Sequence, residues 1–325
     1  MTALPASPWT LDSVPGSFTE TDMRVFEWLL SYQARRHTPG DLLEIGVHLG
    51  RSAIVLGRHL REGDVFTVCD LFGSPAPGED NRREVTELSP APDRDAFEIN
   101  YLAYHSTLPE VVHGPSASVA FHVKPGSCRF VHLDASHLHA EISADLAAAR
   151  ELLVEGGVVA VDGYRCRRTP GVAAAVWEAF SAGGLRPVCL SPGKFYGTWG
   201  DPGPIQDELV AWLAERPDEW TVAEETVAGR RVIRLDRDPA DAAAPGQTLP
   251  LPEVAPEAAQ EAAPDSPQEG TPAPAPVKAP AWTSTRSAKS RRAKGKAGRG
   301  KRKKSWRHRL ARKLVPNALR RLRRR

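Results

Sequence analysis

The sequence predicts an α/β domain built on a doubly wound, mostly parallel sheet with helices on both faces. Short apolar segments alternate with segments of helical periodicity from about residue 17 to residue 236. Two glycines follow the first apolar segment where a helix is expected to begin, and acidic residues follow several of the other segments. Strands that alternate with helices form parallel sheets, because each helix returns the chain to the same end of the sheet.

The elements follow one another in a regular order. A helix is expected from a capping-box pattern, Ser17-Phe-Thr-Glu20, to about Arg36. The expected strands are 41–45, 65–70, 111–112, 129–133, 158–161, 188–190 and 231–235. The expected helices between them are 50–61, 94–105, 139–153, 169–182 and 205–215. Residues 72–95 are rich in Pro, Gly and charge, and we expect a long loop of the kind that often serves as a lid.

Composition divides the chain into four parts. Residues 1–16 are expected to be irregular, and residues 17–236 to form the α/β domain. Residues 237–285 are dominated by Ala, Pro, Glu and Asp, with few large aliphatic side chains. Such a segment cannot bury enough apolar surface to offset the entropy of ordering, so it is expected to be a disordered linker. Residues 286–325 form a polybasic tail.

This tail holds 20 of the 43 Lys and Arg residues of the chain and none of its 40 Asp and Glu residues. Lys301-Arg-Lys-Lys304 is its densest run, and apolar residues recur at near-helical spacing from Trp306 onwards. A short amphipathic helix with many cations binds polyanions. Nucleic acid and an anionic membrane surface both remain open as partners.

The four cysteines are widely spaced and form no CxxC pair, which favours a reducing compartment. The N-terminus shows no signal-peptide pattern, and no apolar run reaches the length of a membrane span. We therefore expect a cytoplasmic protein, with association through the tail left open.

Residues 42–52 carry the strongest local pattern. An apolar strand leads into Glu44, and then into a loop with Gly46 and Gly50 before the next helix. Glycines let a backbone approach a ligand closely, and a helix N-terminus offers free N–H groups. Asp70 ends the next strand, where a carboxylate can accept hydrogen bonds from a ribose. The pattern predicts binding of a small molecule that contains a nucleoside.

Acidic residues lie at the carboxyl ends of four expected strands, and they are Glu44, Asp70, Asp134 and Asp162. Each one alone could merely cap a loop or helix. Ligands of open α/β sheets bind beyond the carboxyl ends of the strands, so the four together favour a ligand site.

Several motifs together carry a family resemblance. These are Glu44-Ile-Gly-Val-His-Leu-Gly-Arg-Ser52, Leu133-Asp-Ala-Ser-His137, Gly156-Gly-Val-Val-Ala-Val-Asp162 and Pro170-Gly-Val172. The first resembles the first motif of class I S-adenosylmethionine-dependent methyltransferases, and it lacks the GxGxxG spacing of dinucleotide enzymes. The others resemble the branch of macrocin- and catechol-type O-methyltransferases. The resemblance covers about residues 20–200. It implies a Rossmann-like sheet and methyl transfer from S-adenosylmethionine to an oxygen of a small molecule or sugar.

The resemblance also implies which residues hold the cofactor. The loop residues Glu44, Gly46, Gly50 and Ser52 would hold its methionine part, and Asp70 would bind the ribose hydroxyls. Ser116, in Gly-Pro-Ser where the family usually has Gly-Asp-Ser, would contact the adenine side.

For the acceptor side, Asp134 and Asp162 match positions that bind a divalent metal, such as Mg²⁺, in metal-dependent relatives. The metal would lower the pKa of a substrate hydroxyl. Relatives often carry a second acid or amide directly after the fifth strand, where this chain has Gly163, so one ligand is missing. His137 stands where relatives carry a candidate base and would act beside Asp134, although a surface or capping histidine is the alternative.

A rival hypothesis is a binding protein that keeps the cofactor fold without turnover and is recruited to nucleic acid or anionic membrane by its basic tail. Gly163 and Pro115, which replace acids of the family pattern, favour this rival.

Overall fold

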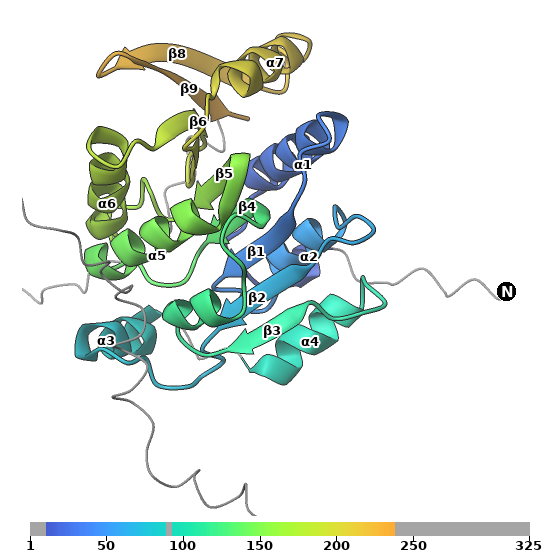
Figure 1. The fold of residues 1–325 in the computed structure, drawn as a ribbon, viewed down its shortest axis with the longest axis vertical. Coiled ribbons are helices and arrows are strands. Elements are labelled where there is room, and N and C mark those ends of the chain that lie inside the picture. Colours follow the sequence, from blue (N-terminus) through green and yellow to red (C-terminus); the bar gives the residue numbers. More distant parts are fainter. Residues whose placement is uncertain (1–10, 89–92, 238–325) are drawn as a thin grey trace, which may run out of the picture. The chain divides into compact units, whose positions relative to one another are not determined.

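The computed structural model describes residues 11–88 and 93–237. These residues form a nine-stranded mixed sheet in the order β3-β2-β1-β4-β5-β7-β6-β9-β8. Helices cover both of its faces (Figure 1). The α/β class and the mostly parallel sheet expected from the sequence are confirmed.

The strands are β1 (Asp41–Ile45), β2 (Phe66–Asp70), β3 (Glu110–His113), β4 (Cys128–Leu133), β5 (Leu153–Val161), β6 (Arg186–Leu190), β7 (Phe195–Thr198), β8 (Thr221–Val227) and β9 (Arg230–Asp236). The α-helices are α1 (Glu20–Arg35), α2 (Arg51–Gly57), α3 (Glu79–Leu88), α4 (Arg94–Leu102), α5 (His139–Leu152), α6 (Pro170–Ser181) and α7 (Gly203–Ala214). Two short 3-10 helices are η1 (Leu11–Ser13) and η2 (Ser116–Phe121).

The strands β1 to β5 pair in parallel, and their carboxyl ends are level. Ile45 of β1 is opposite Leu133 of β4, which is opposite Val161 of β5. The next residues along β4 and β5 are Asp134 and Asp162. The register of the sheet therefore brings these two acids to the same edge.

The rest of the sheet is mostly antiparallel. β7 lies between β5 and β6 and pairs antiparallel with both. Phe195, the first residue of β7, is opposite Val161, the last residue of β5. The residue before β7, Lys194, consequently emerges at the edge where Asp162 emerges.

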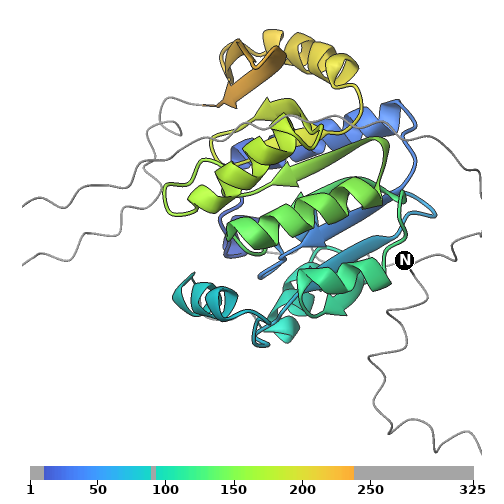
Figure 2. The ribbon, with the colours of Figure 1, turned by 60° about the vertical axis from the view of Figure 1, so that its left-hand side comes forward.

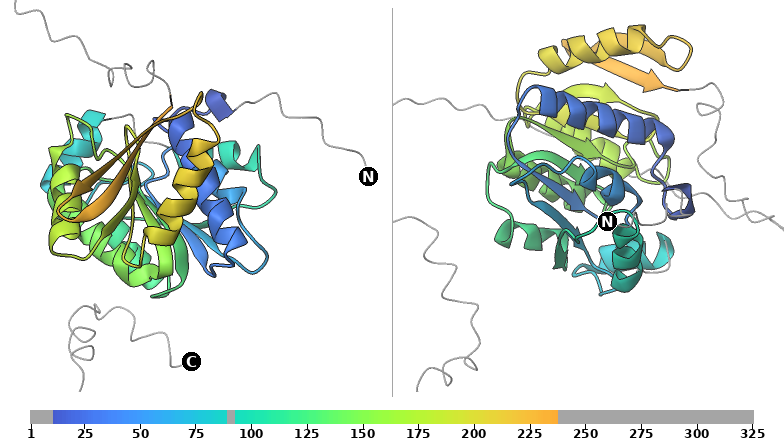
Figure 3. Two further views of the ribbon diagram at one scale, coloured as in Figure 1. Left: turned by 90° about the horizontal axis from the view of Figure 1, so that it is seen from above. Right: turned by 90° about the vertical axis from the view of Figure 1, so that its right-hand side faces the viewer.

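Alternation along the strands separates two apolar clusters. Leu42 and Leu43, neighbours in β1, belong to different clusters, as do Phe130 and Val131 in β4. One cluster packs against α1, α2, α4 and α7, and the other against η2, α5 and α6. The two helical layers are visible in Figure 2 and, from two further directions, in Figure 3.

The prediction of a long loop at 72–95 is partly wrong, because α3 lies within this segment. This helix has few apolar residues, and its Arg83 lies 4.0 Å from Glu79 and 3.7 Å from Asp80. Helical pairs of opposite charge support a helix without producing an apolar stripe, so hydrophobic periodicity missed it. In Figure 1, α3 stands beyond the arrowheads of β2 and β3.

Smaller differences concern element ends and edges. α1 is capped by Thr19, whose Oγ1 accepts from the backbone N of Asp22 at 3.1 Å, rather than by Ser17. Strands β7 and β8 were not expected, and β8 is a mostly exposed, polar edge strand. The expected irregular N-terminus contains η1. The predicted tail, and the predicted linker apart from Arg237, lie outside the described residues, as do residues 1–10.

Among the helices that the structure describes, none has the length and apolar character that crossing a membrane requires. All four cysteines are free, and of these Cys166 alone is exposed.

Candidate active site

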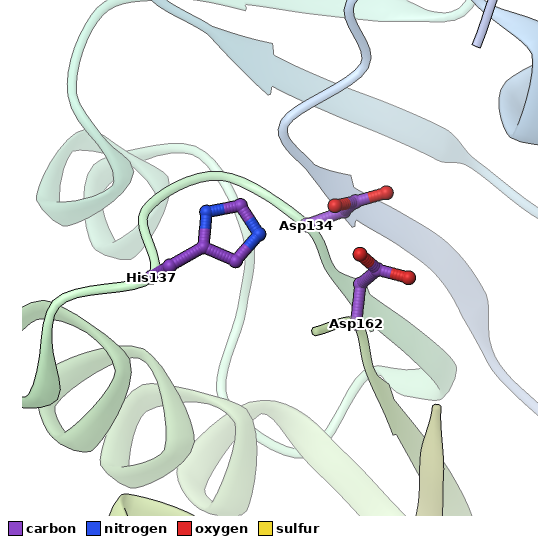
Figure 4. Close-up of side chains that lie close together, drawn as sticks. All are labelled: Asp134, His137 and Asp162. Carbon is purple, nitrogen blue, oxygen red and sulfur yellow. The ribbon is translucent and has the colours of Figure 1, made fainter. Parts of the chain in front are cut away.

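Three predicted site residues meet at the carboxyl edge of the sheet. Asp134 follows β4, Asp162 follows β5, and His137 lies in the loop between β4 and α5. Figure 4 shows the His137 ring facing the two carboxylates. One ligand-capable atom from each residue lies within 4.8 Å of the others. Their side chains are 18–24% exposed, so the cluster is sheltered and still open to a reactant.

Lys194 joins this cluster, and the sequence analysis missed it. Its ammonium donates a hydrogen bond to Asp162 Oδ1, and Nζ lies 3.7 Å from Asp134 Oδ2. Nζ also lies 3.1 Å from Nε2 of His132. The Lys194 side chain is only 1% exposed, so a buried cation sits between the two acids.

The acids and the lysine change one another's pKa values. Burial lowers the pKa of Lys194, but the nearby carboxylates of Asp162 and Asp134 outweigh burial and raise it above its usual value. Burial raises the pKa of Asp162, but Lys194 outweighs it and the net shift is downward. Burial, followed by the charge of Asp162, raises the pKa of Asp134 well above its usual value. Lys194 therefore favours the charged form of Asp162, and of the two acids Asp134 is the one more readily protonated.

A second buried network runs from Lys194 to the first loop, which is the loop of residues 46–50 between β1 and α2. An ammonium only donates, so His132 Nε2 accepts and its Nδ1–H donates to Glu44 Oε1 at 2.8 Å. Burial, and next the charge of Lys194, lowers the pKa of His132 well below its usual value. Ser52 Oγ also donates to Glu44 Oε1. The acid pair and the predicted cofactor loop are thus connected through protein atoms.

Glu44 is completely buried beneath the loop. Burial raises its pKa to about 8, against the hydrogen bond from Ser52. Its second oxygen, Oε2, has no hydrogen-bond partner among the residues that the structure describes. This oxygen is a buried polar atom whose hydrogen-bonding capacity is unused.

Asp70 shapes the same loop from β2. Its Oδ2 accepts from the backbone N of Val47 at 2.8 Å and of His48 at 3.0 Å. Its Oδ1 accepts from the backbone N of Phe72 at 2.9 Å. A ribose hydroxyl in the predicted position would therefore share this carboxylate with three backbone N–H donors.

Gly46 and Gly50 are required by the packing of the protein itself. Gly46 has a φ of +88°, and a Cβ there would overlap the backbone carbonyl of Asp134. Gly50 has a φ of +92°, and its Cβ would lie 2.9 Å from the ring of Phe97 in α4. The close approach that the sequence suggested for a ligand is made here by the end of β4 and by α4.

Ser116 begins η2, beyond β3. Burial raises the pKa of Asp145 in α5 to about 6. A hydrogen bond from the Ser116 side chain acts in the opposite direction and lowers that pKa. The hydroxyl thus contacts α5, the helix between β4 and β5. Its adenine contact stays a prediction.

His137 is held by α3, through a residue that the sequence analysis missed. Glu84 Oε1 accepts from the backbone N of His137 at 2.6 Å, and Oε2 accepts from Ser136 Oγ at 2.6 Å. The His137 Nδ1 atom lies 3.3 Å from Glu84 Oε1. Burial raises the pKa of Glu84, but these hydrogen bonds outweigh burial and lower it overall.

Gly163 explains why the second acid of the family pattern is missing. Its φ is +72°, and a Cβ would lie 2.7 Å from Cδ2 of His137. An Asp or Asn side chain at this place would push the His137 ring aside.

With Lys194 in this position, the residues do not fit a divalent metal ion. Both carboxylates that would bind the ion already face one ammonium. Repulsion between two unit charges about 4 Å apart costs about 4 kcal/mol near a protein surface, and a divalent ion doubles one of the charges. The metal role that the resemblance implies for Asp134 and Asp162 is therefore not supported by this geometry.

One family model matches the part of the chain that holds this cluster. Residues 43–164 match the model of a family described as a methyltransferase domain. Over these residues the chain is similar to a methyltransferase domain. The resemblance of its motifs to class I methyltransferases is thereby confirmed. The matched segment runs from β1 to just beyond β5, so it includes the first loop and both acids.

Solved structures with similar folds include several methyltransferases. The O-methyltransferase NovP is 20% identical, with 55% of this chain and 81% of NovP covered and a TM-score of 0.45. CalS11, a TDP-rhamnose 3'-O-methyltransferase of calicheamicin biosynthesis, is 20% identical, with 57% and 82% covered and a TM-score of 0.39. A putative O-methyltransferase from Klebsiella pneumoniae is 15% identical, with 62% and 92% covered and a TM-score of 0.43. A search of curated proteins found no match.

Proposed function

We propose that the methyltransferase domain transfers a methyl group from S-adenosylmethionine to an oxygen atom of a small molecule or sugar. The observation that carries this proposal is the match of residues 43–164 to a methyltransferase family, with the acids and His137 gathered at one edge of the sheet. Ligands of open α/β sheets bind at that edge.

The described residues fit a nucleoside cofactor. A carboxylate has about four acceptor positions, and Asp70 uses three of them on backbone N–H groups. One position is left for a ribose hydroxyl. Glu44 Oε2 is a further polar atom without a hydrogen-bond partner among the described residues. Glu44, Gly46, Gly50 and Ser52 would hold the methionine part, and Ser116 the adenine side.

The cofactor supplies an electrophilic methyl group on a sulfonium. In the transfer a carbon–oxygen bond forms as the carbon–sulfur bond breaks, and the hydroxyl proton passes to His137 Nε2. His137 acts as the base because it is partly exposed at the site and fixed by Glu84. Asp134 orients the acceptor hydroxyl, and the rate depends mainly on in-line positioning.

Titration calorimetry with S-adenosylmethionine and S-adenosylhomocysteine tests the cofactor first, and the absence of binding to both would contradict the proposal. An acceptor screen with radiolabelled cofactor then identifies substrates. His137→Ala is expected to abolish transfer and to leave cofactor affinity unchanged. His139→Ala is the matched control, because His139 is 45% exposed and pairs with Glu178 instead.

We also propose that residues 286–325 bind a polyanion, on the basis of their charge alone. Salt-dependent retention on heparin should be lost when these residues are deleted. Duplex DNA and vesicles of anionic phospholipid then distinguish nucleic acid from a membrane surface. Retention that survives the deletion would contradict this proposal.

A further inference from the structure

Lys194 lies between the two acids to which the family resemblance assigns a divalent metal ion. An ammonium has three donors, and here one goes to Asp162 and one to His132, with Asp134 next to the same nitrogen. Asp134 and Asp162 are also the residues that would hold a divalent ion. We propose that Lys194 is a built-in cation that replaces the metal, so that methyl transfer by this chain needs no divalent ion. This inference rests on the proposed function.

The lysine is fixed by the fold. Its backbone N donates to Ser191 Oγ at 2.9 Å, which closes the turn before β7. Ser191 Oγ in turn donates to Asp22 Oδ1 of α1 at 2.6 Å, and Tyr196 OH donates to the same oxygen at 2.7 Å. The turn is therefore tied to α1 from both sides of Lys194. These buried hydrogen bonds fix the backbone from which the Lys194 side chain reaches the acid pair.

A second, independent observation leads to the same conclusion. The position directly after Asp162, where metal-dependent relatives carry another oxygen ligand, is Gly163. The space that its side chain would need is taken by the ring of His137. The chain thus lacks one ligand of the metal set and adds a cation among the remaining ones.

Lys194 acts as a positioning residue in this arrangement. At 1% exposure it does not reach an acceptor molecule, whereas Asp134 is 24% exposed. Lys194 offsets the negative charge of the pair and holds the Asp162 carboxylate in place. Asp134 and His137 are then the groups that an acceptor hydroxyl meets.

The test uses Mn²⁺ as the probe and the full chain as the protein. Water-proton relaxation measures Mn²⁺ bound to the wild type, to Asp162→Asn and to Lys194→Met. The wild type is expected to show no Mn²⁺ binding that depends on Asp162. Lys194→Met is expected to bind Mn²⁺ at least about tenfold more tightly than the wild type, because the repelling ammonium is gone.

Lys124→Met is the matched control, because Lys124 is exposed and the substitution removes the same charge elsewhere. It should leave Mn²⁺ binding unchanged. Lys194→Met/Asp162→Asn should lose the site that Lys194→Met gains.

Two results would overturn the inference. One is Mn²⁺ binding by the wild type that Asp162→Asn abolishes, which can be read even where Lys194→Met does not fold. The other is unchanged Mn²⁺ binding in a folded Lys194→Met protein. Titration of the same proteins with S-adenosylhomocysteine separates the two proposals, since loss of cofactor binding contradicts the proposed function and leaves the Mn²⁺ result intact.

Discussion

The first loop and the acid pair compensate their charges in different ways. Asp70 is held by backbone N–H groups of Val47, His48 and Phe72, all at the ends of β1 and β2. Asp162 is held by the side chain of Lys194, which is 32 residues further along and directly precedes an antiparallel strand. The first kind of compensation is local and comes with the strand–loop–helix unit. The second depends on the assembly of the whole sheet.

This difference has an energetic consequence. A carboxylate that accepts backbone hydrogen bonds loses little if one neighbouring side chain changes, because the donors belong to the main chain. A buried carboxylate paired with one ammonium is left uncompensated when that side chain is removed. The acceptor side of the site should therefore be the more sensitive of the two to single substitutions.

The largest effect is expected from Lys194→Met. Removing the cation leaves Asp162 without its partner, and we expect a loss of about 3–5 kcal/mol in the free energy of unfolding. Urea unfolding followed by circular dichroism measures it. Adding Asp162→Asn should recover part of the loss, and Lys124→Met should change stability by less than about 0.5 kcal/mol. A loss below about 1 kcal/mol for Lys194→Met would show that the pair behaves like an exposed salt bridge.

Gly46→Ala tests the joint between the two regions, where β1 ends against Asp134. For an alanine, the left-handed backbone conformation alone costs about 1–2 kcal/mol, and overlap with the Asp134 carbonyl adds to this cost. We therefore expect a loss of more than about 2 kcal/mol in the free energy of unfolding. Gly126→Ala is the matched control, because Gly126 has a φ of +63° and a Cβ added there would meet nothing within 4 Å. Equal losses for the two substitutions, measured by urea unfolding, would mean that the β1–β4 contact contributes nothing.

Glu44→Gln tests the connection that runs through His132. The pKa of Glu44 is raised to about 8, above that of an unfolded glutamate, so the folded chain holds a proton that the unfolded chain releases. This contribution to stability is present at low pH and is lost as the pH rises towards 8. Between about pH 6 and pH 8, the free energy of unfolding of Glu44→Gln should therefore rise by on the order of 2 kcal/mol relative to that of the wild type. A difference between the two proteins that does not vary with pH, in urea unfolding at each pH, would contradict the raised pKa.

The smallest effect is expected from Glu84→Ala in α3. It removes the acceptor of two hydrogen bonds from the loop after β4, and we expect a loss of about 1–2 kcal/mol. Hydrogen exchange of the α3 amides should become faster. Asp80→Ala, on the exposed face of the same helix, should change stability by less than about 0.5 kcal/mol. If both substitutions accelerate exchange equally, Glu84 does not anchor α3.

The sequence was a good guide to the parallel half of the fold. Apolar runs predicted β1, β2, β4 and β5, and the acids that follow them predicted the edge where Asp134 and Asp162 meet. These features repeat a local unit, so local patterns are sufficient to find them. β8 and α3 were missed because charged surfaces carry no hydrophobic period.

Lys194 could not be placed from the sequence in the same way. It follows Ser-Pro-Gly, where a lysine is ordinarily solvated, and nothing in its neighbours indicates 1% exposure. Its position depends on the antiparallel insertion of β7 between β5 and β6. Glu84 was hidden for a similar reason, because its partner Ser136 lies 52 residues away.

The turn that carries Lys194 also sets an order of events during synthesis. The strands β1 to β5 leave the ribosome before Lys194 does, so both acids are synthesised before the cation that pairs with them. The pair is completed only when β7 enters the sheet and Ser191 and Tyr196 bond to Asp22 of α1, the first long helix of the chain. If the chain were divided between α6 and β6, the first fragment would lack Lys194. The second fragment would lack Asp22, Asp134 and Asp162. Such a division is a natural place to build a split version of the protein, whose halves report on their own reassembly.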